Sequence, residues 1–252
     1  MPRIKFIQDM RLQGNKILIT GATGGIGEAL LMKFLALDNS VIAVGRNELK
    51  LHELARIDKY IIPFLCDVSK TEDLNNLVTF VEQKHPDTNI LINNAGIQFN
   101  YHFEEPKLLG KIEQEVAINF LAPLKLTALL LPTLNRNRNA AIVNVSSGIG
   151  LVPKKQAPVY CGTKAGIHIF SKALRYQLSQ VKVFEIIPPL VDTEMTAGRG
   201  KGKISPEQLV EEFVSAFKKD TYEINIGKVK WLKLLNRWMP SVAERIMKRG
   251  GE

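Results

Sequence analysis

Residues 16–27 read KILITGATGGIG, a short apolar run that ends in a cluster of glycines. The run predicts a strand over 16–20, and the apolar pattern that follows predicts a helix from Ile26 to Leu37. Glycines at such a turn let backbone N–H groups at the start of the helix approach a pyrophosphate. The stretch therefore predicts the first strand, turn and helix of a dinucleotide-binding α/β fold.

The same alternation of apolar strands and helices continues along the chain. Further strands are predicted over 40–45, 60–65, 89–94, 140–147 and 181–187, and further helices over 47–57, 71–84, 106–131 and 158–179. Strands that are nearly continuous apolar runs and alternate with helices are typical of a parallel sheet covered on both faces. We therefore expect one doubly wound, Rossmann-type α/β domain over residues 14–252.

Three segments fall outside this alternation. Residues 1–13 are expected to form an N-terminal extension, and residues 193–220 a substrate lid. Residues 221–252, which are rich in lysine and contain both tryptophans, are expected to form a basic amphipathic appendage.

The composition excludes several classes of protein. Two cysteines, Cys66 and Cys161, and four histidines without His-x-x-x-His spacing predict neither a disulfide framework nor a metal site. The first residues lack the apolar run of a signal peptide, and the most apolar stretch, 120–134, is interrupted by two prolines and a lysine, so we expect a soluble, cytoplasmic protein. The net charge of +9 favours a basic solvated surface, with an anionic ligand or membrane as alternatives. Nucleic acid is not an expected partner, because no binding motif accompanies the charge.

The glycine turn fits two motifs and does not decide between them, whereas the residue after the second predicted strand indicates the type of nucleotide. The turn fits two spacings, since Gly21, Gly25 and Gly27 give T-G-x-x-x-G-x-G, and Gly21, Gly24 and Gly27 give T-G-x-x-G-x-x-G. The second predicted strand is followed by Arg46, where an acidic residue would read a ribose 2′-hydroxyl and an arginine accommodates a 2′-phosphate. We predict NADP(H), with NAD(H) as the alternative in which Arg46 only caps the loop.

Tyr160 and Lys164 lie four residues apart in the helix predicted over 158–179. Positions i and i+4 share one helix face, so a phenol and an ammonium are held side by side. A nearby ammonium favours the phenolate and lowers the tyrosine pKa, as a group that gives and takes protons requires. The pair is either a surface accident or an acid/base device.

Further motifs resolve this choice through a resemblance. They are CDV (66–68), NNAG (93–96), Asn119, IVNVSS (142–147) and PPLVDT (188–193). With them, residues 14–195 resemble the classical branch of the short-chain dehydrogenase/reductase superfamily, and most of all its DltE-like oxidoreductases. The resemblance implies an NAD(P)(H)-dependent oxidoreductase that interconverts a carbonyl and an alcohol. The alternative is a nucleotide-binding sensor or scaffold of the same fold without turnover.

The resemblance also assigns roles to residues. It makes Tyr160 the acid/base, and Lys164 the residue that lowers its pKa and holds the nicotinamide ribose. Ser147 is expected to hydrogen-bond the substrate oxygen, and Ser146 is one position short of the usual spacing from Tyr160. Asn119 is expected to hold a relay water. The residues expected to bind the cofactor are Gly21, Thr23, Gly25, Ile26, Gly27, Arg46, Asp67, Val68, Asn94, Ala95, Gly96, Tyr160, Lys164, Pro188, Val191 and Thr193. Pro189 stands where the family often has glycine, and proline makes this turn stiffer.

Substrate contacts are expected from loops at the carboxyl ends of the strands, over 97–105, 148–158 and 193–204. The last loop alternates three glycines with Arg199, Lys201 and Lys203. This pattern favours a mobile basic lid and a small carbonyl or alcohol substrate that is anionic or acyl-bearing. A solvated loop is the alternative.

Residues 228–238 place Trp231, Leu234, Leu235 and Trp238 at i, i+3, i+4 and i+7, with basic residues between them. Such a stripe more often covers a core or a partner subunit, and the alternative is peripheral contact with a membrane. The resemblance further implies a homodimer or homotetramer formed through the long helices.

Overall fold

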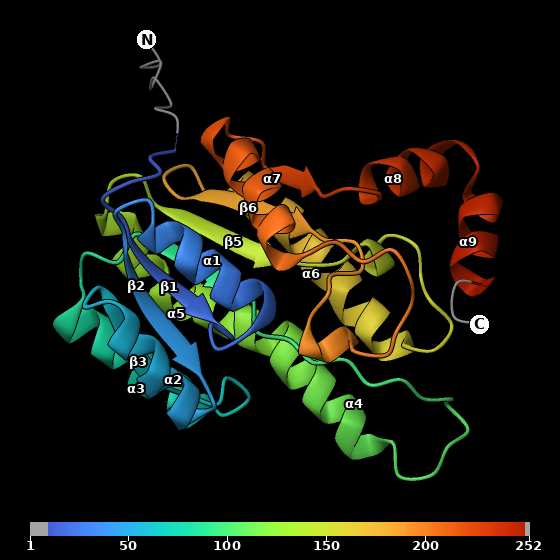
Figure 1. Cartoon of the computed structure of the whole chain (residues 1–252), viewed down its shortest axis with the longest axis horizontal. Coiled ribbons are helices and arrows are strands. Elements are labelled where there is room, and N and C mark those ends of the chain that lie inside the picture. Colours follow the sequence, from blue (N-terminus) through green and yellow to red (C-terminus); the bar gives the residue numbers. More distant parts are fainter. Residues whose placement is uncertain (1–9, 250–252) are drawn as a thin grey trace.

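The structure is a computed structural model that describes residues 10–249, so residues 1–9 of the predicted extension and residues 250–252 lie outside the described residues. Within residues 10–249, seven strands form one sheet in the order β3-β2-β1-β4-β5-β6-β7, and every neighbouring pair is parallel (Figure 1). The strands are β1 (Lys16–Thr20), β2 (Ser40–Gly45), β3 (Ile61–Leu65), β4 (Ile90–Asn93), β5 (Ala141–Val145), β6 (Lys182–Ile187) and β7 (Glu223–Asn225). The predicted doubly wound parallel fold is confirmed.

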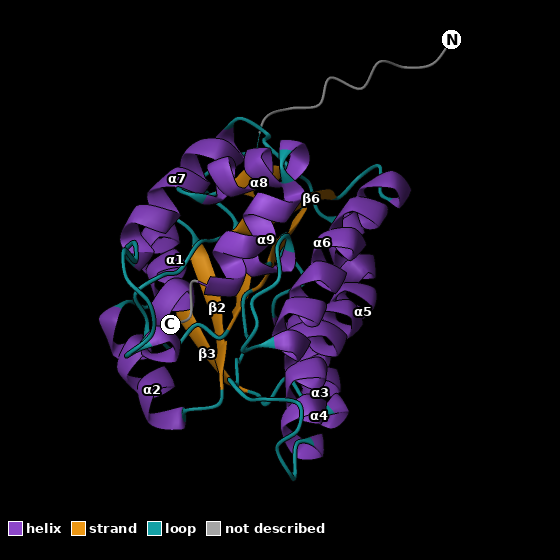
Figure 2. Ribbon diagram, turned by 90° about the vertical axis from the view of Figure 1, so that its right-hand side faces the viewer, coloured by secondary structure: helices purple, strands orange, loops and turns teal. Residues whose placement is uncertain are grey.

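Helices cover both faces of the sheet (Figure 2). One face carries α1 (Gly25–Leu35), α2 (Glu48–Ile57) and α7 (Pro206–Lys218). The other carries α3 (Thr71–Lys84), α4 (Leu109–Val116), α5 (Ala122–Arg136) and α6 (Pro158–Gln177), with the π-helical segment η1 (Ala117–Leu121) joining α4 to α5.

Strands β1 to β6 each contribute to two hydrophobic cores, and β7 contributes to one. Ile17 and Ile19 pack with α1 and α7, whereas Leu18 packs with α3 and α5 on the opposite face. Successive strand side chains point to opposite faces, so a strand between two helical layers must be apolar at nearly every position. Met10 is buried in the first core and Leu12 packs against it. These two residues therefore belong to the domain and not to the predicted N-terminal extension.

The strand order creates a crevice. From β1 the chain proceeds outward to β2 and β3, then returns to β4 and proceeds outward in the other direction. The connections after β1 and β4 therefore diverge at the carboxyl ends of these strands, which is where α/β sheets of this kind bind ligands. The turn at 20–27 and the NNAG motif meet at this point.

The C-terminal third corrects the predicted lid and appendage. Part of the segment 193–220 is helix α7, which packs on α1 and buries Phe213 and Phe217 in the core. Part of the appendage is β7, which extends the sheet beside β6. A three-residue edge strand with two polar residues has no apolar run to reveal it. The segment that can still form the predicted lid is therefore 193–205.

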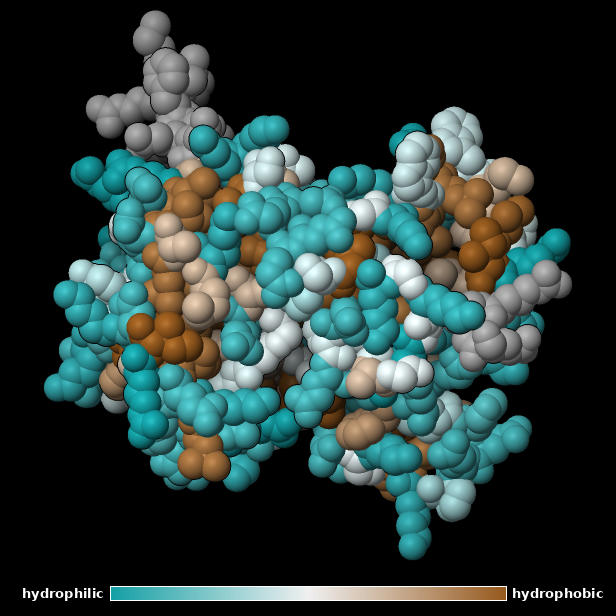
Figure 3. All heavy atoms as spheres, viewed as in Figure 1, coloured by the Kyte–Doolittle hydropathy of each residue, from teal (hydrophilic) through white to brown (hydrophobic). Residues whose placement is uncertain are grey.

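The tryptophan stripe lies on α8 (Val229–Trp238), which is followed by α9 (Pro240–Arg249). Trp231 and Trp238 are each 73% exposed, and Val229 on the other side of α8 is buried. Figure 3 shows apolar side chains gathered on the surface over α8 and α9. The stripe therefore does not cover the core, and contact with a partner or a membrane remains the prediction for it.

α4, η1 and α5 form one continuous helix over Leu109–Arg136. This helix continues through Pro132, beyond residue 131, where the sequence predicted its end. By length and composition this helix is apolar enough to cross a membrane. However, 44% of its most apolar window is buried inside the fold, with Leu126 and Leu130 in the second core. A helix in the core of a globular domain has the same length and composition, and the buried face of Leu109–Arg136 places this helix in the second core.

We predict that Phe213→Ala lowers the free energy of unfolding by about 3–5 kcal/mol, because it removes a fully buried ring between α7 and α1. Phe103→Ala is the matched control, since this ring is 64% exposed, and it should change stability by about 0.5 kcal/mol or less. Chemical denaturation measures both. An equal, small loss for the two variants would mean that α7 is a lid element rather than part of the core.

Candidate active site

The glycine turn is tight because three side chains are missing from it. Gly21 and Gly25 have φ of 66° and 56°, in the left-handed region that favours glycine. A Cβ placed at Gly27 would lie 2.1 Å from the carbonyl oxygen of Gly21. The first turn of α1 therefore lies directly against the end of β1, and its N–H groups face the crevice.

The NNAG motif clamps this turn. The side-chain amide of Asn94 donates to the carbonyl oxygens of Thr20 and Gly21 at 2.9 and 3.2 Å. The backbone N–H groups of Asn94 and Ala95 both donate to the hydroxyl of Thr20, at 3.0 and 3.1 Å. The predicted cofactor residue Asn94 thus holds the shape of the turn, and Thr20, which the sequence analysis did not select, is its partner.

A cavity of about 440 Å³ opens beside the turn, where the molecular surface is hollowed between α2 and α4 (Figure 3). Six predicted cofactor residues line it: Gly21, Thr23, Arg46, Val68, Ala95 and Gly96. Lys50 also lines it and lies 3.8 Å from Glu194 of the lid. Glu194 lines the cavity as well, so Arg46 and Lys50 leave its rim with a net charge of one positive unit. Lys50 was missed because a lysine on an exposed helix carries no distinctive signal.

Asp67 lies next to this cavity. Burial raises its pKa, but hydrogen bonds from the hydroxyl and N–H of Ser69, with the charges of Arg46 and Lys70, outweigh burial and leave the pKa below its ordinary value. Asp67 is therefore an ionised acceptor at neutral pH.

The remaining cofactor residues occupy less direct positions. Ile26 is half-buried and packs against the first core, and Val191 is buried in that core, so its side chain is not exposed in the crevice. Thr193 lies beside the turn, since a Cβ at Gly25 would be 2.9 Å from its methyl group. Pro188 uses its carbonyl oxygen to accept the N–H of Gly148 at 2.9 Å.

Tyr160 and Lys164 are both buried on one face of α6, with the Lys164 Nζ 5.6 Å from the centre of the Tyr160 ring. The Nζ donates to the carbonyl oxygen of Val145 at 2.8 Å. Burial lowers the pKa of Lys164 to about 8, against the charge of Glu185, which favours the ammonium. Two such groups at one buried position are not a surface accident.

The pKa of Tyr160 departs from expectation. It is raised, not lowered, because burial and the nearby Cys161 and Glu115 disfavour the phenolate more than Arg199 favours it. The Lys164 ammonium donates to a backbone carbonyl and does not reverse the effect of burial on Tyr160. Tyr160 is accordingly a neutral phenol at physiological pH, which is the form that donates a proton.

Asn119 lies in the π-helical segment η1, a local widening that is common at functional sites. Its Oδ1 accepts the N–H of Ile97 and its Nδ2 donates to the carbonyl oxygen of Ile97, each at 2.8 Å. A Cβ at Gly96 would lie 3.3 Å from Asn119 Oδ1 and 3.6 Å from Lys164 Nζ. Asn119 and Lys164 therefore converge on Gly96, and the relay water stays a prediction.

Ser147 follows β5 and caps the 3-10 turn η2 (Gly148–Gly150), where its hydroxyl accepts the N–H of Ile149 at 3.4 Å. This turn lies against α6, because a Cβ at Gly150 would be 2.8 Å from the backbone of Lys164. The Ser146 hydroxyl instead donates to the buried carboxylate of Glu185 at 2.5 Å. Of the two serines, only Ser147 is free of a buried partner.

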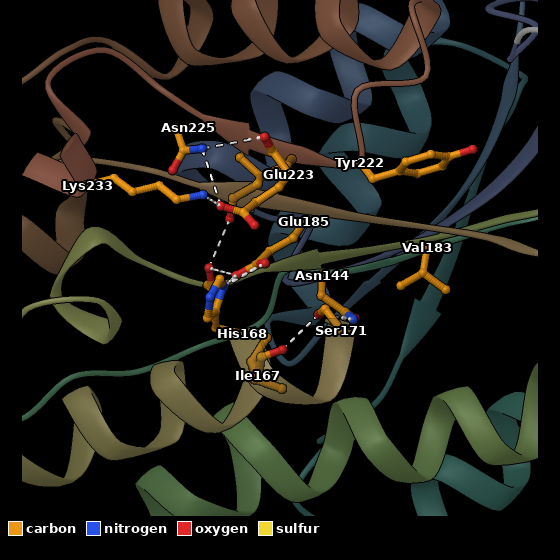
Figure 4. A network of polar contacts seen from close by, with 12 residues as sticks. Asn144, Ile167, His168, Ser171, Val183, Glu185, Tyr222, Glu223, Asn225 and Lys233 are labelled. Carbon is orange, nitrogen blue, oxygen red and sulfur yellow. Dashed lines mark hydrogen bonds and ion pairs between the residues drawn. The ribbon is translucent and has the colours of Figure 1, made fainter. Parts of the chain in front are cut away.

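A buried polar network lies behind the pair (Figure 4). Glu185 on β6 is fully buried and accepts from Ser146, and the Nδ1 of His168 lies 2.9 Å from it. Arg175 lies 3.7 Å from the same carboxylate. His168 follows Lys164 by one helical turn, so this network connects β6 to the helix that carries the pair. Glu185 was not selected from the sequence, since it sits in the apolar run VKVFEII.

Glu115 on α4 is also fully buried and was not predicted. It accepts the N–H of Phe99 at 2.8 Å and the hydroxyl of Tyr101 at 3.2 Å. With Asn119, it fixes the start of the predicted substrate loop 97–105 next to Tyr160.

Comparison with known proteins agrees with this geometry. The sequence profile described as "short chain dehydrogenase" matches residues 15–203. The Bacillus subtilis (strain 168) protein described as "Uncharacterized oxidoreductase DltE" is 37% identical over 233 residues, which cover 89% of this chain and 92% of that protein.

Two solved structures share the fold. A short-chain dehydrogenase from Burkholderia cenocepacia J2315 in complex with NADP has a TM-score of 0.85 at 22% identity, covering 94% of this chain and 99% of that one. A short-chain dehydrogenase/reductase from Burkholderia phymatum in complex with NAD has a TM-score of 0.81 at 16% identity, covering 96% and 98%. These two structures show the fold, and the profile match together with the DltE relative establishes that the chain belongs to the short-chain dehydrogenase/reductase family of oxidoreductases.

Proposed function

We propose that the chain is an NADP(H)-dependent oxidoreductase that interconverts a carbonyl and an alcohol, with Tyr160 as the acid/base. The observation that carries the proposal is the buried Tyr160–Lys164 pair on one face of α6, next to the glycine turn at the carboxyl edge of the sheet. A phenol with a neighbouring ammonium in a buried site is suited to proton transfer, and a protein that only binds nucleotide does not require it.

The residues around the cavity fit a nicotinamide dinucleotide. The turn leaves no space for a side chain at Gly27, and its backbone N–H groups are available to a pyrophosphate. Arg46 and Lys50 at the rim suit a 2′-phosphate, and no acidic residue occupies the end of β2. When bound, the nicotinamide supplies or accepts the hydride. The structural relatives described as complexes with NADP and with NAD leave NAD(H) as the alternative.

The chain's own residues supply the protons and the orientation. Ser147 is placed to donate a hydrogen bond to the substrate oxygen as negative charge develops on it. The neutral phenol of Tyr160 donates its proton to that oxygen during reduction. Lys164 holds its positive charge below about pH 8 and stabilises the phenolate that results.

We also propose that the protein is cytoplasmic and forms a homodimer or homotetramer through the outer face of α5 and α6. Leu129 and Ile169 are exposed on these helices, and an apolar face of this kind suits a partner subunit. Both cysteines are free and buried, as in proteins of reducing compartments.

Replacing Tyr160 with Phe should lower kcat by about 10²–10⁴-fold and leave NADPH affinity within about twofold, because the variant loses only the proton donor. The measurement combines NADPH titration with the loss of reduced-nicotinamide absorbance over a panel of ketones, aldehydes and 3-oxoacyl thioesters. Tyr60→Phe, at an exposed position away from the crevice, is the control and should keep full activity. Binding without turnover by the unmodified protein on every carbonyl would instead favour a sensor or scaffold.

Replacing Arg46 with Ala should weaken NADPH binding by about tenfold or more and NADH binding by less than about twofold, because one charge-assisted contact to the 2′-phosphate is lost. Arg56→Ala, on the exposed surface of α2, the helix that follows Arg46, should change neither. Parallel losses for NADPH and NADH in the Arg46 variant would show that this residue only supports the loop.

Replacing Glu185 with Gln should move the high-pH limb of the kcat profile to lower pH. The Glu185 charge opposes the effect of burial on Lys164, so without it the pKa of Lys164 falls further below its ordinary value and the ammonium is lost sooner as the pH rises. Glu185→Asp keeps the charge and should keep the limb near its original position. A loss of kcat that is equal at every pH would mean that Glu185 is structural only.

A further inference from the structure

The three cations of the lid have different surroundings. Lys203 pairs with Asp192 at 3.0 Å and donates to the carbonyl oxygen of Thr196 at 2.8 Å. Lys201 is exposed to solvent. Arg199 lies between two exposed glycines, Gly198 and Gly200, yet its own side chain is partly buried. Lys203 is part-buried as well but is paired within the lid, whereas Arg199 reaches the loop 97–105.

The backbone of the lid favours this arrangement. Gly198 and Gly200 have φ of 72° and 58°, which side-chain-bearing residues rarely adopt. The N–H of Arg199 donates to the carbonyl oxygen of Thr196 at 3.0 Å, in continuation of the turn η3 (Glu194–Thr196). Two left-handed glycines on either side of one arginine fix the direction in which its long side chain leaves the lid.

The guanidinium reaches the substrate loop but is only partly satisfied. Its Nη2 donates to the carbonyl oxygen of Gln98 at 3.3 Å. Its Nη1 is buried and has no hydrogen-bond partner among the described residues. A buried donor without a partner is costly, and native proteins rarely leave one without a purpose.

Arg199 also lies within electrostatic reach of the catalytic phenol, because its charge favours the Tyr160 phenolate. Glu115, whose charge also acts on Tyr160, already accepts hydrogen bonds from Phe99 and Tyr101, and the described residues show no ion pair between it and Arg199. An arginine with unpaired N–H donors beside a reaction centre suits an oxyanion, because carboxylates and phosphates can accept two parallel N–H bonds from a guanidinium.

We propose that Arg199 is a specificity-determining residue that binds an oxyanion, a carboxylate or a phosphate, carried by the carbonyl substrate. This rests on the proposed function, since the substrate's carbonyl is the group that meets Tyr160. The oxyanion completes the hydrogen bonds of Nη1 and holds the lid against the loop 97–105. Among the lid cations, Lys201 and Lys203 have no part in this contact.

The test compares matched substrates in the presence of NADPH. The carboxylate arm uses keto acids from 2-oxopropanoate to 6-oxoheptanoate, each with its methyl ester, and the phosphate arm uses dihydroxyacetone phosphate with dihydroxyacetone. The unmodified enzyme should prefer the anion of at least one pair. Arg199→Gln should raise KM for that anion by about tenfold or more and change KM for its neutral partner by less than about twofold. Arg199→Lys should restore part of the affinity, and Lys201→Gln is the matched control that should change nothing.

A calorimetric arm separates this inference from the proposed function. The preferred anion should bind to the NADP⁺ complex of Tyr160→Phe, which lacks turnover, and should not bind after Arg199→Gln is added. Equal preference for acids and esters, or an equal effect of Arg199→Gln on both, would overturn the inference. A loss of NADPH affinity in Arg199→Gln with unchanged substrate preference would also overturn it, because Arg199 would then hold the cofactor.

Discussion

The active site depends on keeping one ammonium charged inside the protein. Lys164 is buried, and burial alone disfavours its charge. Two features oppose this: the carbonyl oxygen of Val145 accepts a hydrogen bond from the ammonium at 2.8 Å, and the negative charge of Glu185 favours the charged form. Gly150 of the serine turn approaches the backbone of Lys164, and Gly96 of the NNAG motif approaches its Nζ, because neither glycine places a side chain between. The sheet edge, the serine turn and α6 therefore meet at Lys164.

The crevice has a second origin, in the order of the strands. Because β1 lies between β2 and β4, the connections after β1 and β4 separate and leave space at the carboxyl edge. Asn94 and Thr20 bridge this space and hold the glycine turn open toward it. Arg46 follows β2 on one side of the switch point, and α6 with Tyr160 follows β5 on the other. This separation suits the proposed ligand, which has a phosphate at one end and a reactive ring at the other.

The C-terminal third combines rigid and adaptable parts. α7 and β7 belong to the core and sheet, and the proposed substrate lid is confined to residues 193–205. α8 packs on the serine turn through Val229 and leaves Trp231 and Trp238 exposed. The proposed lid lies close to the start of α8, since a Cβ at Gly202 would be 2.9 Å from Lys228 Nζ.

Sequence alone determined the fold and most of the candidate site. Glycine spacing, apolar strands and the Tyr160–Lys164 interval are local signals, because steric limits, strand alternation and helix periodicity act over a few residues. The same local signals did not reveal β7, whose polar residues are tolerated only at a sheet edge. Nor did they reveal the buried carboxylates of Glu185 and Glu115, because each gains its partners from other segments of the chain. The state of Tyr160 was also decided by the tertiary structure. Helix spacing places an ammonium beside it, but burial and nearby groups from other elements set the sign of its pKa shift.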